Sequence, residues 1–160
     1  MTSNWQVPYV EPGPAPGVAF ASPGPRLAAY IVDIIIVTMV IILVAIVGGL
    51  ATAVSFRGGA GAATVSSVVL LVFGILAVSL GYFPYFWAHD GSTPGMRMFG
   101  LRVVRDIDGG PISGGQAVLR LLGYWVSSIA FYLGFVWIFV DRRHRGWHDL
   151  IAGTVMIERR

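Results

Sequence analysis

The residue with the clearest capacity for chemistry is Asp33, the only charged residue in an apolar run from Leu27 to Val54. An ionised carboxylate inside hydrocarbon costs several kcal/mol unless it is paired or faces a polar seam. Arg26 lies close to two helical turns earlier, so the two side chains project from one helix face about 10 Å apart. Arg120 begins a later apolar run and is a second candidate partner. The sequence predicts that Asp33 pairs with Arg26 or Arg120, as a structural lock or as a proton or cation site.

Two His-Asp dipeptides, at residues 89–90 and 148–149, are of a type found in metal hydrolases. Zinc sites need further ligands at helical spacing, and the only other histidine is His144. A glycine lies between His144 and His148, and no glutamate occupies the position that a zincin base requires. The chain also lacks cysteine, a GxxxxGK[ST] phosphate loop and a GxSxG nucleophile elbow. We therefore expect no enzyme activity, no metal and no cofactor.

The positive charge of the chain is carried by arginine, because all 11 Lys+Arg positions are arginine. These arginines flank apolar runs and lack the aromatic interleaving of a groove for single-stranded nucleic acid. We therefore expect membrane lipids with anionic head groups as partners, and no nucleic acid. The residues predicted to contact head groups are Arg97, Arg102, Arg142, Arg143, Arg145 and Trp147.

Apolar residues make up 56% of the chain and charged residues 12%, about half the charged share usual in soluble domains. A chain of 160 residues cannot bury so much apolar surface in its own core, so lipid must cover it. The run from Leu27 to Val54 exceeds the roughly 20 residues that cross a bilayer, and so does the uncharged run from Ala62 to Ala88. The second run closes on an aromatic cluster typical of a membrane interface, at residues 82–87. The sequence predicts an all-α membrane protein with two transmembrane helices.

Residues 89–113 form a polar stretch after the second span. Thr93-Pro94 offers a helix start, and apolar residues recur at i, i+3 and i+7 from Met96 to Val103, which predicts an interfacial amphipathic helix. A small hairpin around Asp108-Gly109 is the alternative for residues 101–112.

A third apolar run extends from Gln116 to Val140 and is either a full span or a re-entrant segment that bends at Gly134. Its length favours a single span, whereas a bend would gather almost all arginines on one side, as the positive-inside bias requires. Both alternatives stay open. In either case we expect a cytoplasmic amino terminus, residues 57–61 outside the cytoplasm and residues 89–113 facing it.

The ends of the chain differ in composition from its middle. Residues 1–25 are rich in proline and glycine and have no apolar periodicity, which predicts a disordered tail. The predicted transmembrane domain then covers residues 26–157, and residues 158–160 are a charged C-terminus.

Residues 26–33, 91–105, 141–149 and 152–154 together resemble the RDD family of bacterial membrane proteins, named for one arginine and two aspartates. The matching segments occur in the right order and spacing over about residues 22–157. The resemblance implies that Arg26 is the family arginine and that Asp33 and Asp149 are the aspartates. It also implies a multi-pass protein of the bacterial inner membrane. A role in transport is commonly suggested for the family, and some members are linked to cation/proton antiport.

Two functions compete at this point. One is an accessory or scaffolding subunit of a larger membrane assembly, because the chain is short and its helices carry small residues at regular spacing. The other is an oligomeric transport element for protons or monovalent cations that uses Asp33 and Asp149. Two or three helices cannot enclose a path alone, so transport requires a homo-oligomer or a larger complex.

Overall fold

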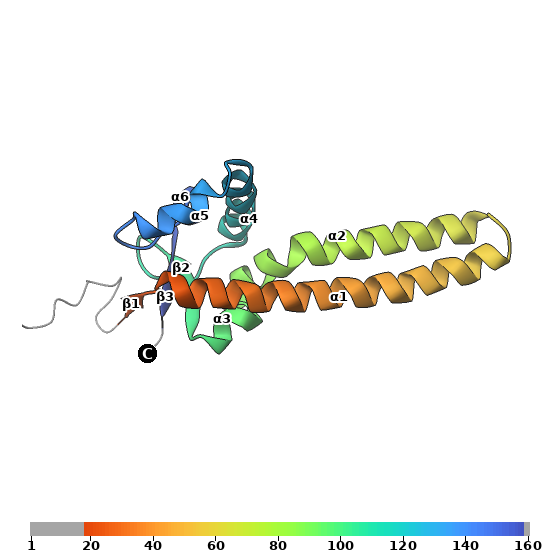
Figure 1. Cartoon of the computed structure of the whole chain (residues 1–160), viewed down its shortest axis with the longest axis horizontal. Coiled ribbons are helices and arrows are strands. Elements are labelled where there is room, and N and C mark those ends of the chain that lie inside the picture. The colour runs from red at the N-terminus through yellow and green to blue at the C-terminus, as the bar shows by residue number, and fades with distance from the viewer. Residues whose placement is uncertain (1–17, 159–160) are drawn as a thin grey trace, which may run out of the picture.

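A long helical hairpin dominates the computed structural model, which describes residues 18–158 (Figure 1). The hairpin consists of α1 (Pro23–Arg57) and α2 (Ala62–Asp90), joined by a short turn at its far end. Both helices are long and apolar enough to cross a membrane. The two predicted transmembrane helices and the mainly helical fold class are therefore confirmed.

The hairpin is longer than the membrane needs. The 35 residues of α1 extend about 50 Å at 1.5 Å per residue, whereas the hydrocarbon layer is about 30 Å thick. Proline near the start of α1 suits a first helical turn, where its missing N–H is not needed. One end of the hairpin therefore extends beyond the hydrocarbon layer.

The remaining elements gather around the end of the hairpin where α1 begins and α2 ends (Figure 1). We call this part, residues 18–22 and 91–158 with the adjoining ends of α1 and α2, the sheet end. Its elements are β1 (Ala19–Phe20), α3 (Pro94–Met98), β2 (Leu101–Arg105), α4 (Gly114–Ile129), α5 (Leu133–Val136), the 3₁₀ helix η1 (Trp137–Phe139), α6 (Trp147–Ala152) and β3 (Thr154–Glu158).

A small antiparallel sheet with strand order β1-β3-β2 forms the centre of the sheet end. Val103 lies opposite Met156, and Phe20 lies opposite Ile157. Because side chains alternate along a strand, the sheet buries apolar residues on both faces. One face packs on the hairpin and α4 through Ala21, Ala29, Trp87, Met96, Leu101, Val103, Ile112, Ala117 and Met156, and the other contains Val104, Val155 and Ile157.

The sheet was not predicted, and it changes the interpretation of residues 94–112. The predicted amphipathic helix is wrong beyond Met98, where α3 ends, and the alternative hairpin is also wrong. Residues 101–105 do form a strand, but its partner is β3 and not residues 108–112. The reason is burial, because Leu101 and Val103 are enclosed by elements that are distant in sequence.

The third apolar run is not one straight helix. Helix α4 and the segment Leu133–Phe139 meet at an angle of 111°, which makes the run a broken span or a re-entrant segment. The bend lies at Phe131 and Tyr132, whose positive φ values of 51° and 63° are unfavourable for residues with side chains. The bend thus lies a few residues before Gly134, where the sequence analysis placed it, and both predicted alternatives fit a run that is bent in this way.

The predicted disordered tail falls largely on residues 1–17, which lie outside the described residues. Its proposed boundary at residue 25 is wrong, because Ala19–Phe20 form β1 and α1 begins at Pro23. Glu158 of the predicted charged C-terminus belongs to β3, and residues 159–160 lie outside the described residues.

Candidate functional site

Asp149 lies at the centre of a buried charge cluster in the sheet end. Arg26, from the first turn of α1, donates from Nη1 to Asp149 Oδ2 at 3.1 Å, and Arg120, from α4, donates from Nη1 to Asp149 Oδ1. The Asp149 and Arg120 side chains have no exposed surface, and that of Arg26 is 6% exposed. One carboxylate therefore joins two helices that are far apart in the chain.

The second bonds of these groups connect the cluster to the sheet. Arg26 donates from Nε to the carbonyl of Ala21 and from Nη2 to the carbonyl of Met156, each at 3.1 Å. Arg120 donates to Oγ1 of Thr154 at 2.5 Å. Asp149 also accepts from the backbone N–H of Gly146 at 3.2 Å, which caps the start of α6. The cluster thus holds α1, α4, α6 and β3 together.

The surroundings shift the pKa values of Asp149 and its neighbour His148. Burial alone would raise the pKa of Asp149, but the guanidinium groups of Arg120 and Arg26 outweigh it and hold this pKa below its usual range. Burial lowers the pKa of His148 to about 4, against the opposing charge of Asp149. The imidazole packs on Tyr124, with ring centroids 4.3 Å apart, and is neutral at physiological pH.

The protein is expected to lose stability as the pH falls from about 6.5 towards 4, because the unfolded chain then binds a proton at His148 that the folded protein excludes. This lowers the free energy of unfolding by up to about 3 kcal/mol. The H148Q variant should show a flatter pH dependence, measured by thermal unfolding in detergent. H89Q, at an exposed histidine, is the control and should follow the wild-type curve. Parallel curves for the wild type and H148Q would contradict this account.

Asp33 occupies a separate site, formed by α1, the end of α2 and α3. Its Oδ1 accepts from the Tyr82 hydroxyl at 2.9 Å and from the Gly95 N–H at 2.8 Å, and its Oδ2 accepts from the Thr93 hydroxyl. Asp33 is 1% exposed. Thr93 also accepts from the Met96 N–H at 3.1 Å and so caps α3. Asp33 therefore fixes the start of α3 against α1.

The predicted ion pair of Asp33 is wrong. Both candidate partners, Arg26 and Arg120, bind Asp149 instead. Arg26 and Asp33 do lie on the buried face of α1, but they bind different elements. Arg26 binds Asp149 of α6, and Asp33 accepts from Gly95 of α3. The sequence thus identified four buried charged residues, Arg26, Asp33, Arg120 and Asp149, without showing which of them pair.

Each site contains one position at which close backbone packing leaves room only for glycine. A Cβ atom at Gly95 would lie 2.8 Å from the Asp33 carboxyl, and one at Gly123 would lie 2.5 Å from Cα of His148. Both distances are shorter than atoms allow. Glycine therefore lets α3 reach Asp33 and lets α6 lie directly on α4.

The residues predicted to contact lipid head groups have different surroundings. Arg143 and Arg145 bind Asp106, each at 2.9 Å, and Arg145 also binds Asp141 at 3.0 Å. The hydrogen bonds and charge of Arg145 lower the pKa of Asp141 despite partial burial. Trp147 is half-buried at the start of α6. Arg142 is exposed, and Arg97 and Arg102 line a pocket that is described below.

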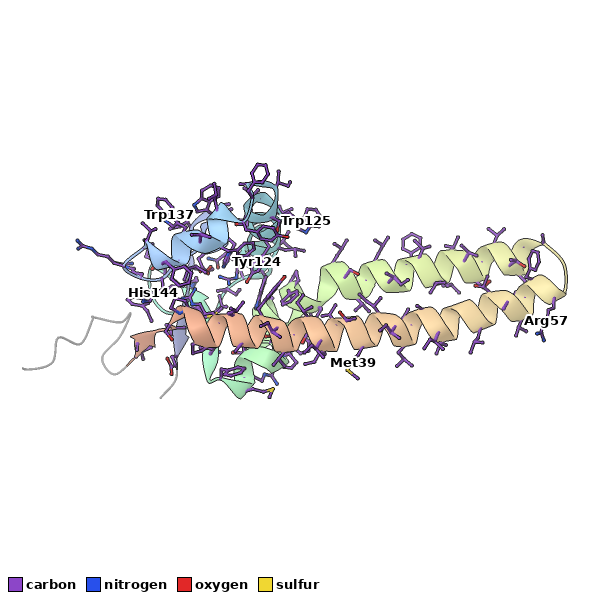
Figure 2. All side chains as sticks on the ribbon, viewed as in Figure 1. Met39, Arg57, Tyr124, Trp125, Trp137 and His144 are labelled. Carbon is purple, nitrogen blue, oxygen red and sulfur yellow. The ribbon has the colours of Figure 1, made fainter. Side chains whose placement is uncertain are left out.

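Several site residues were not predicted, namely Tyr82, Thr93, Gly95 and Thr154. Thr93 carried a local signal, because a threonine before proline marks a helix start, and the capping position brings it to Asp33. Gly95 and Thr154 were marked only by lying in the segments that resemble the family. Figure 2 shows Tyr124 within the sheet end and His144 near its outer side. Within residues 18–158, no three His, Asp or Glu side chains are grouped so that they could hold a metal ion.

Comparison with known proteins gives one family and one relative. The sequence model described as RDD family matches residues 20–153 of the chain. A Bacillus subtilis (strain 168) protein described as "Uncharacterized protein YxaI" is 37% identical over 65 residues, which are 41% of this chain and 42% of that protein. The chain thus matches less than half the length of this relative. No solved structure matches the chain.

Proposed function

The chain belongs to the RDD family, and from that premise we propose that it is a non-enzymatic accessory or scaffolding subunit of a larger membrane assembly. The observation that carries this proposal is that the protein itself occupies both buried carboxylates. Asp149 binds two arginines, and Asp33 accepts three hydrogen bonds from fixed donors. Groups held in this way stabilise a fold and leave little capacity to bind and release an ion.

The composition of the hairpin supports the same proposal. No charged residue lies between Asp33 and Arg57 or between Ala62 and Ala88. The segment from Ile34 to Phe56 alone extends about 34 Å, enough for the hydrocarbon layer, so Asp33 fits at its boundary. The hairpin thus offers lipid or a partner a mainly apolar surface with no charged residue along it.

A groove along the hairpin has the properties of a contact for a partner helix. It lies between α1 and α2, has a volume of about 360 Å³, and includes the small residues Ala51 and Ser67, whereas Gly48 in the same groove is already packed against Leu71 of α2. Small residues allow helix backbones to approach closely in membranes. We propose that a helix of a partner subunit packs here.

The arginines support an orientation in the bacterial inner membrane. Every arginine of the described residues except Arg57 belongs to the sheet end, and Arg57 lies at the far turn of the hairpin (Figure 2). The positive-inside bias then favours a cytoplasmic sheet end, with the amino terminus on the same side. This agrees with the charge distribution expected for a third run that bends back.

The proposal is tested by purifying the full chain from its native membrane in mild detergent and measuring the mass of the complex. We expect a stoichiometric partner that is lost in S67L, which fills the groove with a larger side chain. S66L adds the same side chain one position away, outside the groove, and should retain the partner. Equal retention by both variants would argue against the groove.

Transport of protons or monovalent cations by an oligomer is the alternative, with Asp33 and Asp149 as its acids. The observation in its favour is that the described donors to Asp33 are all neutral, so no arginine competes with a cation there. The purified chain reconstituted alone in vesicles distinguishes the two functions. Cation flux that depends on pH and is lost in D33N would support transport and contradict the accessory role.

A further inference from the structure

A polar pocket lies between the end of α2 and the segment that connects α3 to β2. Its volume is about 440 Å³, and its charged and polar lining includes His89, Asp90, Arg97 and Arg102. The pocket is separate from the buried sites of Asp33 and Asp149, none of whose polar side chains line it. Its two arginines come from different elements, α3 and β2.

Arg102 lines this pocket and, among the described residues, has neither an acceptor for its Nε–H nor a carboxylate partner. Its Nε atom is buried, and no group among residues 18–158 accepts a hydrogen bond from it. The guanidinium is held close to the backbone, because a Cβ atom at Gly91 would lie 2.9 Å from Nε. No carboxylate in the described part of the chain forms an ion pair with it. A guanidinium that lacks both a counter-charge and an acceptor for its buried N–H is costly, and an anion in the pocket that Arg102 lines would supply the counter-charge.

Arg97 adds a second positive charge at the same pocket. It binds Asp90 at 2.5 Å and lies over the ring of Phe86, 5.9 Å from its centroid. Both side chains of this ion pair are substantially exposed, at 52% for Arg97 and 39% for Asp90. An exposed pair contributes little to stability, so Arg97 can share its donors with an incoming anion. With two arginines and one carboxylate, the pocket carries an excess of positive charge.

Exposed side chains near the pocket support a position at the membrane surface. Tyr85, which is 61% exposed, stacks on the pocket residue His89 with ring centroids 5.7 Å apart, and Met98, which is 70% exposed, follows Arg97 in α3. Aromatic and apolar side chains of this kind lie at the level of lipid head groups when a helix leaves the hydrocarbon. An anion that reaches the pocket is therefore close to the phosphate groups of the lipid.

We propose that this pocket binds a phosphate group, with Arg102 as its principal ligand and Arg97 as the second. The planar guanidinium donates two parallel hydrogen bonds to phosphate oxygens, a geometry that ammonium groups do not offer. The phosphate comes from an anionic phospholipid or from free phosphate, which share this chemistry. Six residues were predicted from sequence to contact head groups, and two of them, Arg97 and Arg102, line this pocket.

The test titrates the purified full chain in neutral detergent with three probes, namely short-chain phosphatidylglycerol, short-chain phosphatidylcholine and inorganic phosphate. We expect saturable binding of phosphatidylglycerol and weaker binding of phosphatidylcholine, measured by calorimetry. R102Q should weaken binding about tenfold, the loss of one charge-assisted contact. D90N should strengthen it, because it frees Arg97 from its carboxylate. Binding of inorganic phosphate with a similar affinity would identify the free ion as the source, and its absence would identify the lipid.

R142Q is the matched control, because Arg142 is an exposed arginine outside the pocket. It should bind as the wild type does. Equal losses of affinity in R102Q and R142Q would mean that diffuse surface charge causes the binding, and would overturn the proposal. The proposal would also be overturned if neither phosphatidylglycerol nor inorganic phosphate bound saturably. If R102Q does not fold, R102K replaces it, and wild-type affinity in R102K together with no gain in D90N would overturn the proposal equally.

Discussion

Replacing Asp149 by asparagine is expected to lower the free energy of unfolding by about 3–5 kcal/mol, because it leaves two buried arginines without their carboxylate. Asp149 is the only anionic partner that the described structure gives to Arg26 and Arg120. Asparagine keeps the shape of the side chain but not its charge, so the loss measures the electrostatic part of the cluster. Folded stability is small in total, and a loss of this size should also reduce the amount of protein in the membrane.

The measurement is denaturant or thermal unfolding of the purified chain in detergent, with membrane abundance as a second readout. D108N is the control, since Asp108 forms an exposed ion pair with Arg105 at 2.9 Å and its loss should cost at most about 1 kcal/mol. If D149N and D108N unfold alike, the buried cluster does not stabilise the fold.

The second large effect is expected at Asp33. D33L removes the acceptor for two buried donors, the hydroxyl of Thr93 and the N–H of Gly95, and for the part-buried hydroxyl of Tyr82. Each buried donor left without a partner costs about 1–3 kcal/mol, so the total loss should be at least about 2 kcal/mol. D33N retains an acceptor oxygen and should lose less. Further loss of Arg26 or Arg120 should rescue neither variant, because neither arginine binds Asp33.

Unfolding in detergent again gives the free energies, and limited proteolysis reports whether α3 detaches from α1. T38L is the control, because it replaces an exposed polar residue of the same helix by the same side chain. If removal of Arg26 or Arg120 did rescue D33N, Asp33 would have to pair with that arginine, and the site described above would be contradicted.

The sequence predicted the parts of the fold that depend on neighbouring residues. Hydropathy over a continuous run is sufficient to identify α1 and α2, because lipid imposes the same requirement on every residue of a span. Residues 101–105 carried a strand signal only as one alternative, and residues 154–158 carried none. Their apolar residues become a strand pair only when segments 50 residues apart in the chain meet, and the partner of a strand is not encoded in its own letters.

The candidate site was predictable to a similar extent. The free-energy cost of a carboxylate inside an apolar run identifies Asp33 without any knowledge of the fold. The resemblance to the family identifies Arg26 and Asp149 in the same way. The pairing depends on approach between elements, as the contact between Gly123 of α4 and His148 of α6 illustrates. Helix periodicity places Arg26 and Asp33 on one face, but it does not reveal that α6 inserts Asp149 beside Arg26 while α3 approaches Asp33.

The position of β3 at the centre of the sheet has a consequence for biosynthesis. The ribosome produces β1, the hairpin and β2 before β3, yet β3 is the strand to which both β1 and β2 pair. Asp149 precedes β3 by only a few residues, so Arg26 and Arg120 have no counter-charge while the hairpin is inserting. Membrane insertion and closure of the sheet end are therefore separate events in time. We thus expect a stage during synthesis in which Arg26 and Arg120 lack their carboxylate and can bind lipid phosphate, until Asp149 and β3 have been translated.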